Sequence, residues 1–74
     1  MNPLRELIEN LYPAWKITEV RDARGRVSYS VSRLTPCTPE QRAAGMIDSF
    51  VEDDLRRVAD RLGRQQAIRD QQRL

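Results

Sequence analysis

Cys37 is the residue best suited to covalent chemistry, because it is the only cysteine and stands between Pro36 and Thr38, just ahead of a predicted helix. A helix N-terminus can lower the pKa of a thiol and so favour the reactive thiolate. A nucleophile also needs a base, yet the chain has no histidine and places no other base beside Cys37. We therefore favour a small residue in a connecting loop, and we expect neither an enzyme nor a bound cofactor.

Acidic residues gather between residues 48 and 60, in a stretch predicted to be helical. A hard cation needs several oxygens that converge on one point, usually from a loop, and zinc prefers Cys and His ligands. The acids fan around the helix, so we expect no metal site. Their spacing favours the ordinary i, i+4 ion pairs Glu52–Arg56 and Asp53–Arg57. The alternative is an acidic flank, made of Asp48, Glu52 and Asp53, that docks on a basic groove of a partner protein.

Arginine supplies twelve of the thirteen basic residues, and eleven acidic residues reduce the net charge to +2. That charge is too small to indicate nucleic-acid binding by itself. If a long C-terminal helix returns alongside a hairpin, however, its end meets the hairpin tip. The arginines of the two elements would then form a basic pole that binds phosphates or an acidic protein: Arg21, Arg24, Arg26, Arg61 and Arg64. Compensation of the helix dipole and solubility of the hairpin explain these charges equally well.

The first element that could position these residues is a helix over residues 3–12. Asn2 and Pro3 suit the N-cap and first helical positions, and Pro13 ends the helix. The apolar residues follow the i, i+3, i+4, i+7 spacing of a single helix face: Leu4, Leu7, Ile8 and Leu11.

A β-hairpin follows, with alternating residues on either side of the Asp22–Gly25 turn. If a type I turn is followed by a left-handed bulge at Gly25, Asp22 faces Arg26. The facing pairs then place every large side chain on one face and the serines on the other: Trp15 with Arg33, Ile17 with Val31, and Glu19 with Tyr29. The alternative register, in which Arg21 faces Arg26, sets Ile17 against Ser30 and mismatches the apolar faces.

A long helix is predicted from the capping box that Thr38 and Gln41 form around Pro39. Its apolar residues run from Met46 to Leu62, and Gly63 is the predicted stop, so the helix spans about 24 residues and about 36 Å. Gly45 lies inside this predicted helix, at a cost of about 0.5–1 kcal/mol relative to alanine.

These elements predict one α+β domain over residues 1–63, in which a short helix and a long helix pack on one face of a two-stranded hairpin (αββα). Residues 64–74 form a polar basic tail, either frayed or ordered by a partner. The order of elements resembles that of the small head–tail joining protein of lambdoid phages, without a shared motif. A homodimer is compatible with this layout, with contacts through Val58, Leu62 and Ile68.

The absence of a recognisable catalytic or metal-binding motif favours a small protein-binding module. Such a module would be an adaptor, an assembly part or an inhibitor of a larger machine, and a phage or mobile element would encode it. The alternative is a weakly specific binder of the nucleic-acid backbone. Its contacts would be to phosphates, because the aromatic residues belong to the core and leave no platform on which bases could stack. The start MNPLRELIEN has no apolar leader, and no apolar run could cross a membrane. We therefore expect a cytoplasmic protein.

Overall fold

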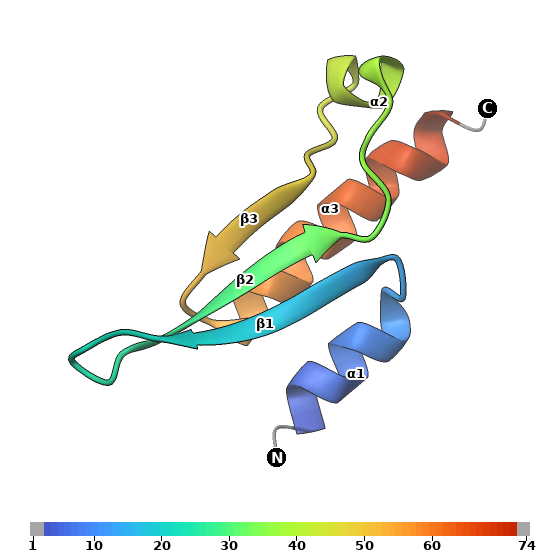
Figure 1. The fold of residues 1–74 in the computed structure, drawn as a ribbon. Helices are drawn as coiled ribbons and strands as arrows, with labels where there is room; N and C mark the ends of the chain where they lie inside the picture. Colours follow the sequence, from blue (N-terminus) through green and yellow to red (C-terminus); the bar gives the residue numbers. More distant parts are fainter. Residues whose placement is uncertain (1–2, 73–74) are drawn as a thin grey trace.

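The computed structural model describes residues 3–72, and within them the chain has an α+β fold with an antiparallel sheet in the order β1-β2-β3 (Figure 1). The predicted N-cap Asn2 lies outside the described residues. The elements follow one another as α1 (Pro3–Leu11), β1 (Trp15–Arg21), β2 (Val27–Arg33), α2 (Pro39–Ala43), β3 (Ser49–Glu52) and α3 (Leu55–Gln72). None of the helices in this range is long and apolar enough to cross a lipid bilayer.

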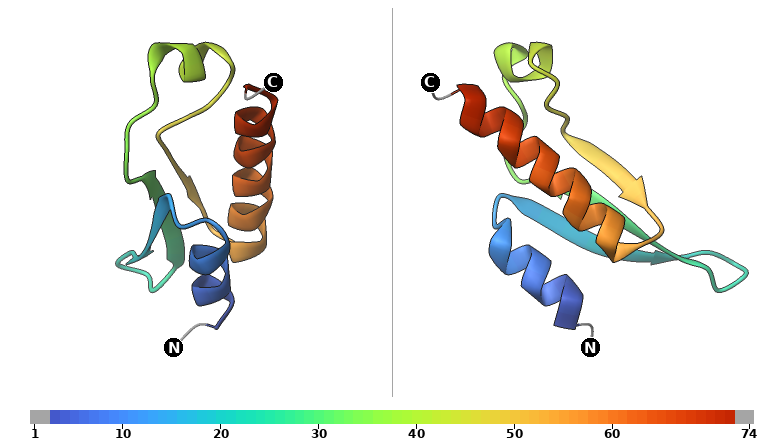
Figure 2. Two further views of the ribbon diagram at one scale, coloured as in Figure 1. Left: turned by 90° about the vertical axis from the view of Figure 1, so that its right-hand side faces the viewer. Right: turned by 180° about the vertical axis from the view of Figure 1, so that it is seen from behind.

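The molecule has two layers, with α1 and α3 on one face of the sheet (Figure 2). Alternate strand residues point toward the helices and meet the apolar side of α3. Trp15 and Phe50 pack edge to face, with ring centroids 5.9 Å apart. The buried core comprises Ile8, Trp15, Ile17, Val31, Phe50, Leu55, Val58 and Leu62.

The predicted hairpin register is confirmed. Ile17 pairs with Val31, Glu19 with Tyr29 and Trp15 with Arg33. At the turn, the Asp22 N–H donates to the Arg26 carbonyl at 2.9 Å, and Gly25 has a φ of +79°. The bulged turn is thus the one that brings the apolar faces of both strands together.

The predicted single long helix is wrong, because α2 ends at Ala43 and the chain turns at Gly45. Gly45 has a φ of +102°, its N–H donates to the Arg42 carbonyl, and the Met46 N–H donates to the Gln41 carbonyl. These two bonds are those of a Schellman motif, in which glycine takes the left-handed position after the helix. The capping box at Thr38 is present as predicted, but it starts a helix of one turn.

The chain after Gly45 forms β3, which makes the sheet three-stranded where the sequence predicted two strands. Val31 pairs with Phe50 and Ser30 with Val51, so Phe50 points into the core and Val51 away from it. Asp54 caps α3, which begins at Leu55, since the Asp54 carboxylate accepts a hydrogen bond from the Arg56 N–H at 2.8 Å.

Gly63 does not stop α3, which continues to Gln72, so the predicted domain boundary at residue 63 falls inside a helix. Gln65, placed in the predicted tail, is 9% exposed. Its side chain accepts a hydrogen bond from the Ile47 N–H at 2.9 Å and donates to the Gly45 carbonyl at 3.4 Å. Gln65 therefore attaches the loop before β3 to α3.

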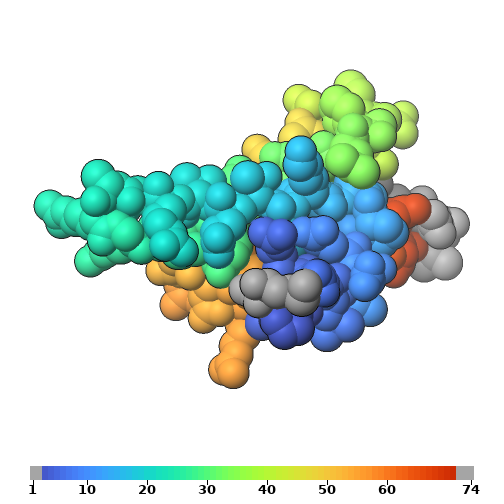
Figure 3. Space-filling view, turned by 60° about the horizontal axis from the view of Figure 1, so that its bottom comes forward, coloured from blue at the N-terminus to red at the C-terminus, as the bar shows by residue number. Residues whose placement is uncertain are grey.

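The hairpin tip extends beyond α1 and α3, as Figure 3 shows at the left. The Cα atoms span 44 × 22 × 18 Å with a radius of gyration of 13.1 Å, against about 11 Å for a compact chain of this length. Asp22 orders the tip, because its carboxylate accepts hydrogen bonds from the N–H groups of Arg24 and Arg26. The tip is thus a structured arm with no core beneath it.

Candidate functional site

The predicted basic pole is not assembled. Because β3 runs back toward the hairpin tip, α3 must lead away from it, and the tip and the far end of α3 lie at opposite ends of the molecule (Figure 3). Arg61 pairs with Glu52 and Arg64 with Asp60, each at 3.0 Å. Within residues 3–72, the tip arginines form no ion pair and are exposed: Arg21, Arg24 and Arg26. The five predicted residues therefore separate into a tip group and a neutralised helix group.

The predicted acidic flank is not a helix surface, since Asp48 precedes β3, Glu52 ends it and Asp53 follows it. Glu52 pairs with Arg61 rather than with Arg56, whereas the predicted pair of Asp53 and Arg57 is present at 3.8 Å. The three acids are thus distributed along both ends of a strand, and each has a basic partner in the structure.

Asp48 joins two loops. Its carboxylate accepts a hydrogen bond from the Cys37 N–H at 2.7 Å and pairs with Arg42. The hydrogen bond from the Cys37 backbone is the main cause that lowers the pKa of Asp48, so the stabilisation is present above the ordinary aspartate pKa and is lost as pH falls through the lowered one. Burial raises the pKa of the Cys37 thiol, which disfavours the reactive thiolate.

The residues predicted for a dimer contact do not form an exposed surface. Val58 and Leu62 are both 0% exposed within the single chain. Ile68 is half-buried, and its Cδ1 lies 3.6 Å from the position that a Cβ on Gly45 would occupy. A contact through Val58 or Leu62 would require the core to open.

Three exposed leucines form an apolar stripe on α1: Leu4, Leu7 and Leu11. We call it the leucine stripe. These side chains are 40%, 54% and 63% exposed, whereas Ile8, at one edge of the same apolar arc, is 2% exposed. The spacing i, i+3, i+7 places the three leucines on one helix face. Since α1 turns only the Ile8 edge toward the core, the rest of its apolar face is left in solvent.

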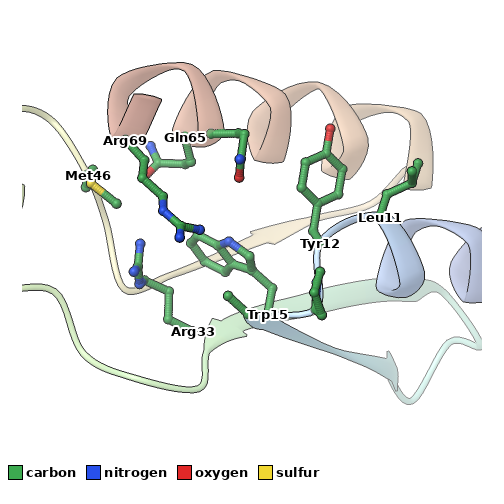
Figure 4. Close-up of a pocket in the computed structure, with 10 residues that line it drawn as sticks. Leu11, Tyr12, Trp15, Arg33, Met46, Gln65 and Arg69 are labelled. Atoms are coloured by element: carbon green, nitrogen blue, oxygen red, sulfur yellow. The ribbon is translucent and has the colours of Figure 1, made fainter. Parts of the chain in front are cut away.

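A pocket of about 130 Å³ lies at the Leu11 end of this stripe (Figure 4). We call it the arginine pocket, because Arg33 from the end of β2 and Arg69 from α3 both line it. Its other walls come from the α1–β1 turn, from the loop before β3 and from α3: Leu11, Tyr12, Pro13, Ala14, Trp15, Met46, Gln65 and Gln66. None of these lining residues is acidic.

The opposite end of the stripe has a different electrostatic character. Leu4 lines a shallow depression together with Tyr29, Asp53, Asp54, Leu55 and Arg57. Asp53 is paired with Arg57 and Asp54 caps α3, so both acids already have partners. The leucine stripe therefore runs from a mixed-charge end to a purely basic end.

Sequence reasoning missed this site because it assigned the whole apolar face of α1 to the core. One signal was available: the correct hairpin register places Arg33 opposite Trp15, on the face that the helices cover. Arg69 carried no such signal, since its position depends on the direction of α3.

Comparison of the chain with protein families, curated proteins and solved structures finds no match. Within residues 3–72, no three side chains of the His, Cys, Asp or Glu types are grouped so that they could hold a metal ion. The case for function therefore rests on the surfaces described above.

Proposed function

We propose that this protein is a small protein-binding module, acting as an adaptor, an assembly part or an inhibitor, and that a partner protein docks on the leucine stripe of α1. The observation that carries the proposal is the exposure of three leucines on one helix face. A contiguous apolar surface bordered by charged residues is typical of a docking site. The neighbouring arginine pocket favours a partner segment that is apolar along its length and acidic at one end.

Burial of the three leucines does not by itself supply enough free energy for a stable complex. Full burial of a leucine contributes about 1.5–3 kcal/mol, and these three side chains are already about half buried. The stripe therefore supplies only about 2–5 kcal/mol, while association costs at least about 4 kcal/mol in lost translation and rotation. A stable complex thus needs charged contacts beside the stripe, which the arginine pocket is placed to provide.

Selection of random peptides displayed on phage tests the docking surface. We expect the native protein to enrich amphipathic peptides, and we expect Leu7→Glu to weaken their binding at least about tenfold, because a buried leucine contact is replaced by a charge. Glutamate keeps the helix propensity of this exposed position close to that of leucine.

Val51→Glu is the matched control, since Val51 is 62% exposed on the face of the sheet that points away from the helices. It should leave peptide binding unchanged. Peptides that bind the Leu7→Glu protein as tightly as the native one, or a failure to enrich any peptide, would contradict docking on the stripe.

A second candidate function, binding of the nucleic-acid backbone, is favoured by one observation. The hairpin arm projects from the body with three exposed arginines that have no ion pair in residues 3–72. A two-stranded ribbon fits the major groove of DNA, and arginines bind phosphates without sequence specificity. The relevant residues are then Arg21, Arg24 and Arg26, without Arg61 and Arg64.

Fluorescence anisotropy of labelled duplex and single-stranded oligonucleotides separates the two candidates. If the arm binds nucleic acid, we expect micromolar affinity that falls steeply with salt and is lost in the double variant Arg24→Ala, Arg26→Ala. Arg64→Ala is the control and should change little, because Arg64 is paired with Asp60. Flat titrations at low salt would exclude this function.

A further inference from the structure

We propose that the arginine pocket receives a single carboxylate of the partner protein, from an aspartate, a glutamate or a chain terminus. This inference rests on the proposed docking function and specifies the chemistry of the partner. The pocket adjoins the leucine stripe through Leu11, which belongs to both. One partner segment can therefore cover the leucines and place an acidic group in the pocket.

Arg33 is held in position before any ligand arrives. Its Cζ lies 5.4 Å from the centroid of the Trp15 ring, and its Nε–H donates to the Thr35 carbonyl at 3.1 Å. These contacts leave the two terminal nitrogens of the guanidinium to bind a ligand. A planar guanidinium with two parallel donors matches the geometry of a carboxylate.

Arg69 approaches the same space from the other side. Figure 4 shows its side chain reaching from α3 toward the Trp15 indole, opposite Arg33. The residues three and four positions before it on the helix are Gln66 and Gln65, so no helical neighbour on that side can neutralise it. Neither Arg33 nor Arg69 forms an ion pair within the part of the chain that the structure describes.

The charge of Arg33 contributes to the lowered pKa of Asp48, so these two groups lie near each other. The Asp48 carboxylate is already engaged by the Cys37 N–H and by Arg42. Two cationic groups therefore share a small pocket whose own walls offer no counter-charge, and an anion supplied from outside would relieve their repulsion.

The size of the pocket decides among anions. At about 130 Å³, it is well below the about 300–1,000 Å³ of pockets for drug-sized ligands and cofactors, so a nucleotide would not fit. Leu11, Trp15 and Met46 give it apolar walls, which suit the methylene groups of an acidic side chain. Free phosphate offers nothing to those walls, and we therefore assign the pocket to a carboxylate on a carbon chain.

Trp15 makes the pocket directly observable, because it is the only tryptophan of the chain and lines the pocket. We would titrate the whole protein with N-acetyl-glutamate amide, with its neutral analogue N-acetyl-glutamine amide and with inorganic phosphate. The readouts are Trp15 fluorescence and the NMR shifts of the Trp15 indole N–H and the Arg33 Nε–H. We expect saturable shifts with the carboxylate at millimolar concentration and none with the amide.

Arg69→Gln should abolish these shifts, and so should Arg33→Gln, whose fold is checked by circular dichroism because its cation–π contact is lost. Arg56→Gln is the matched control, as Arg56 is an exposed residue of α3 outside the pocket. Shifts that persist in Arg69→Gln, equal shifts with the amide, or tighter binding of phosphate would each overturn the assignment to a carboxylate.

The selected peptides separate this inference from the docking proposal. Replacing the acidic residue of a bound peptide by its amide should weaken binding at least about tenfold in the native protein and leave binding unchanged in Arg69→Gln. Peptides that depend on Leu7 but tolerate this replacement would overturn the pocket while leaving the docking surface in place. Carboxylate-dependent shifts at Trp15 without any peptide binding would instead overturn the docking surface.

Discussion

Replacing Leu62 by alanine is expected to lower the free energy of unfolding by about 2–5 kcal/mol. Leu62 is 0% exposed and packs where α3 meets the sheet, so the substitution leaves a cavity that the surrounding core cannot fill. A domain of this size has only about 3–5 kcal/mol of stability from its core. The variant should therefore be largely unfolded at room temperature, as urea denaturation followed by Trp15 fluorescence would show.

Leu11→Ala is the matched control, because it removes the same atoms from a side chain that is 63% exposed. Its stability should stay within about 0.5 kcal/mol of the native value. The two experiments together test which leucines form the core. Equal losses of unfolding free energy for Leu62→Ala and Leu11→Ala would mean that the leucine stripe is covered in solution. A loss for Leu62→Ala that depends on protein concentration would instead support the predicted dimer contact.

The hairpin could be predicted to the residue because its determinants are local. Alternation specifies which face is apolar, Gly25 can take the positive φ, and a shift of one residue would turn Ile17 toward serine. Each competing register is penalised by several side chains at once. The placement of Arg33 opposite Trp15, and with it half of the arginine pocket, follows from the same pattern.

The segment between Gly45 and Asp54 could not be predicted from periodicity. Met46 and Phe50 are four residues apart, as on a helix, but they also suit a loop followed by a short strand. Four residues are too few for alternation to outweigh a helical interpretation. The strand forms because β2 offers it a ladder and because Gln65, eighteen residues after Ile47, holds the preceding loop. Such long-range contacts leave no local signature.

The strand β3, which was predicted as part of a helix, also explains why the residues of the predicted sites lie where they do. A strand in place of half a helix reverses the direction of the last element, so the arginines of α3 leave the hairpin tip and Arg69 approaches Arg33 instead. The charged residues of the predicted basic pole and acidic flank are therefore on the surface, but they lie beside other residues than predicted. The α1 stripe was misjudged for a related reason: an apolar helix face indicates burial, but not whether this chain or a partner provides it.

A pair of glycine substitutions distinguishes the two backbone paths. Gly45→Ala is expected to destabilise the protein by about 1–2 kcal/mol, because φ is +102° there and an L-residue in the left-handed region is strained. Steric conflict is not the cause, since the nearest atom to the added Cβ would be Ile68 Cδ1 at 3.6 Å. The strain acts directly on the Schellman motif that ends α2.

Gly63→Ala should have the opposite effect, stabilising the protein by about 0.5–1 kcal/mol, because Gly63 lies inside α3 and alanine is the better helix former. Its added Cβ would meet the Tyr12 hydroxyl at 3.6 Å, an ordinary contact. Urea denaturation of both variants measures the two signs. In the predicted single helix that stops at Gly63, the two signs would be reversed, because Gly45 would lie inside the helix and Gly63 would be its C-terminal cap. Destabilisation by Gly45→Ala together with stabilisation by Gly63→Ala would therefore support a chain that turns at Gly45 and a helix that continues through Gly63 toward Arg69.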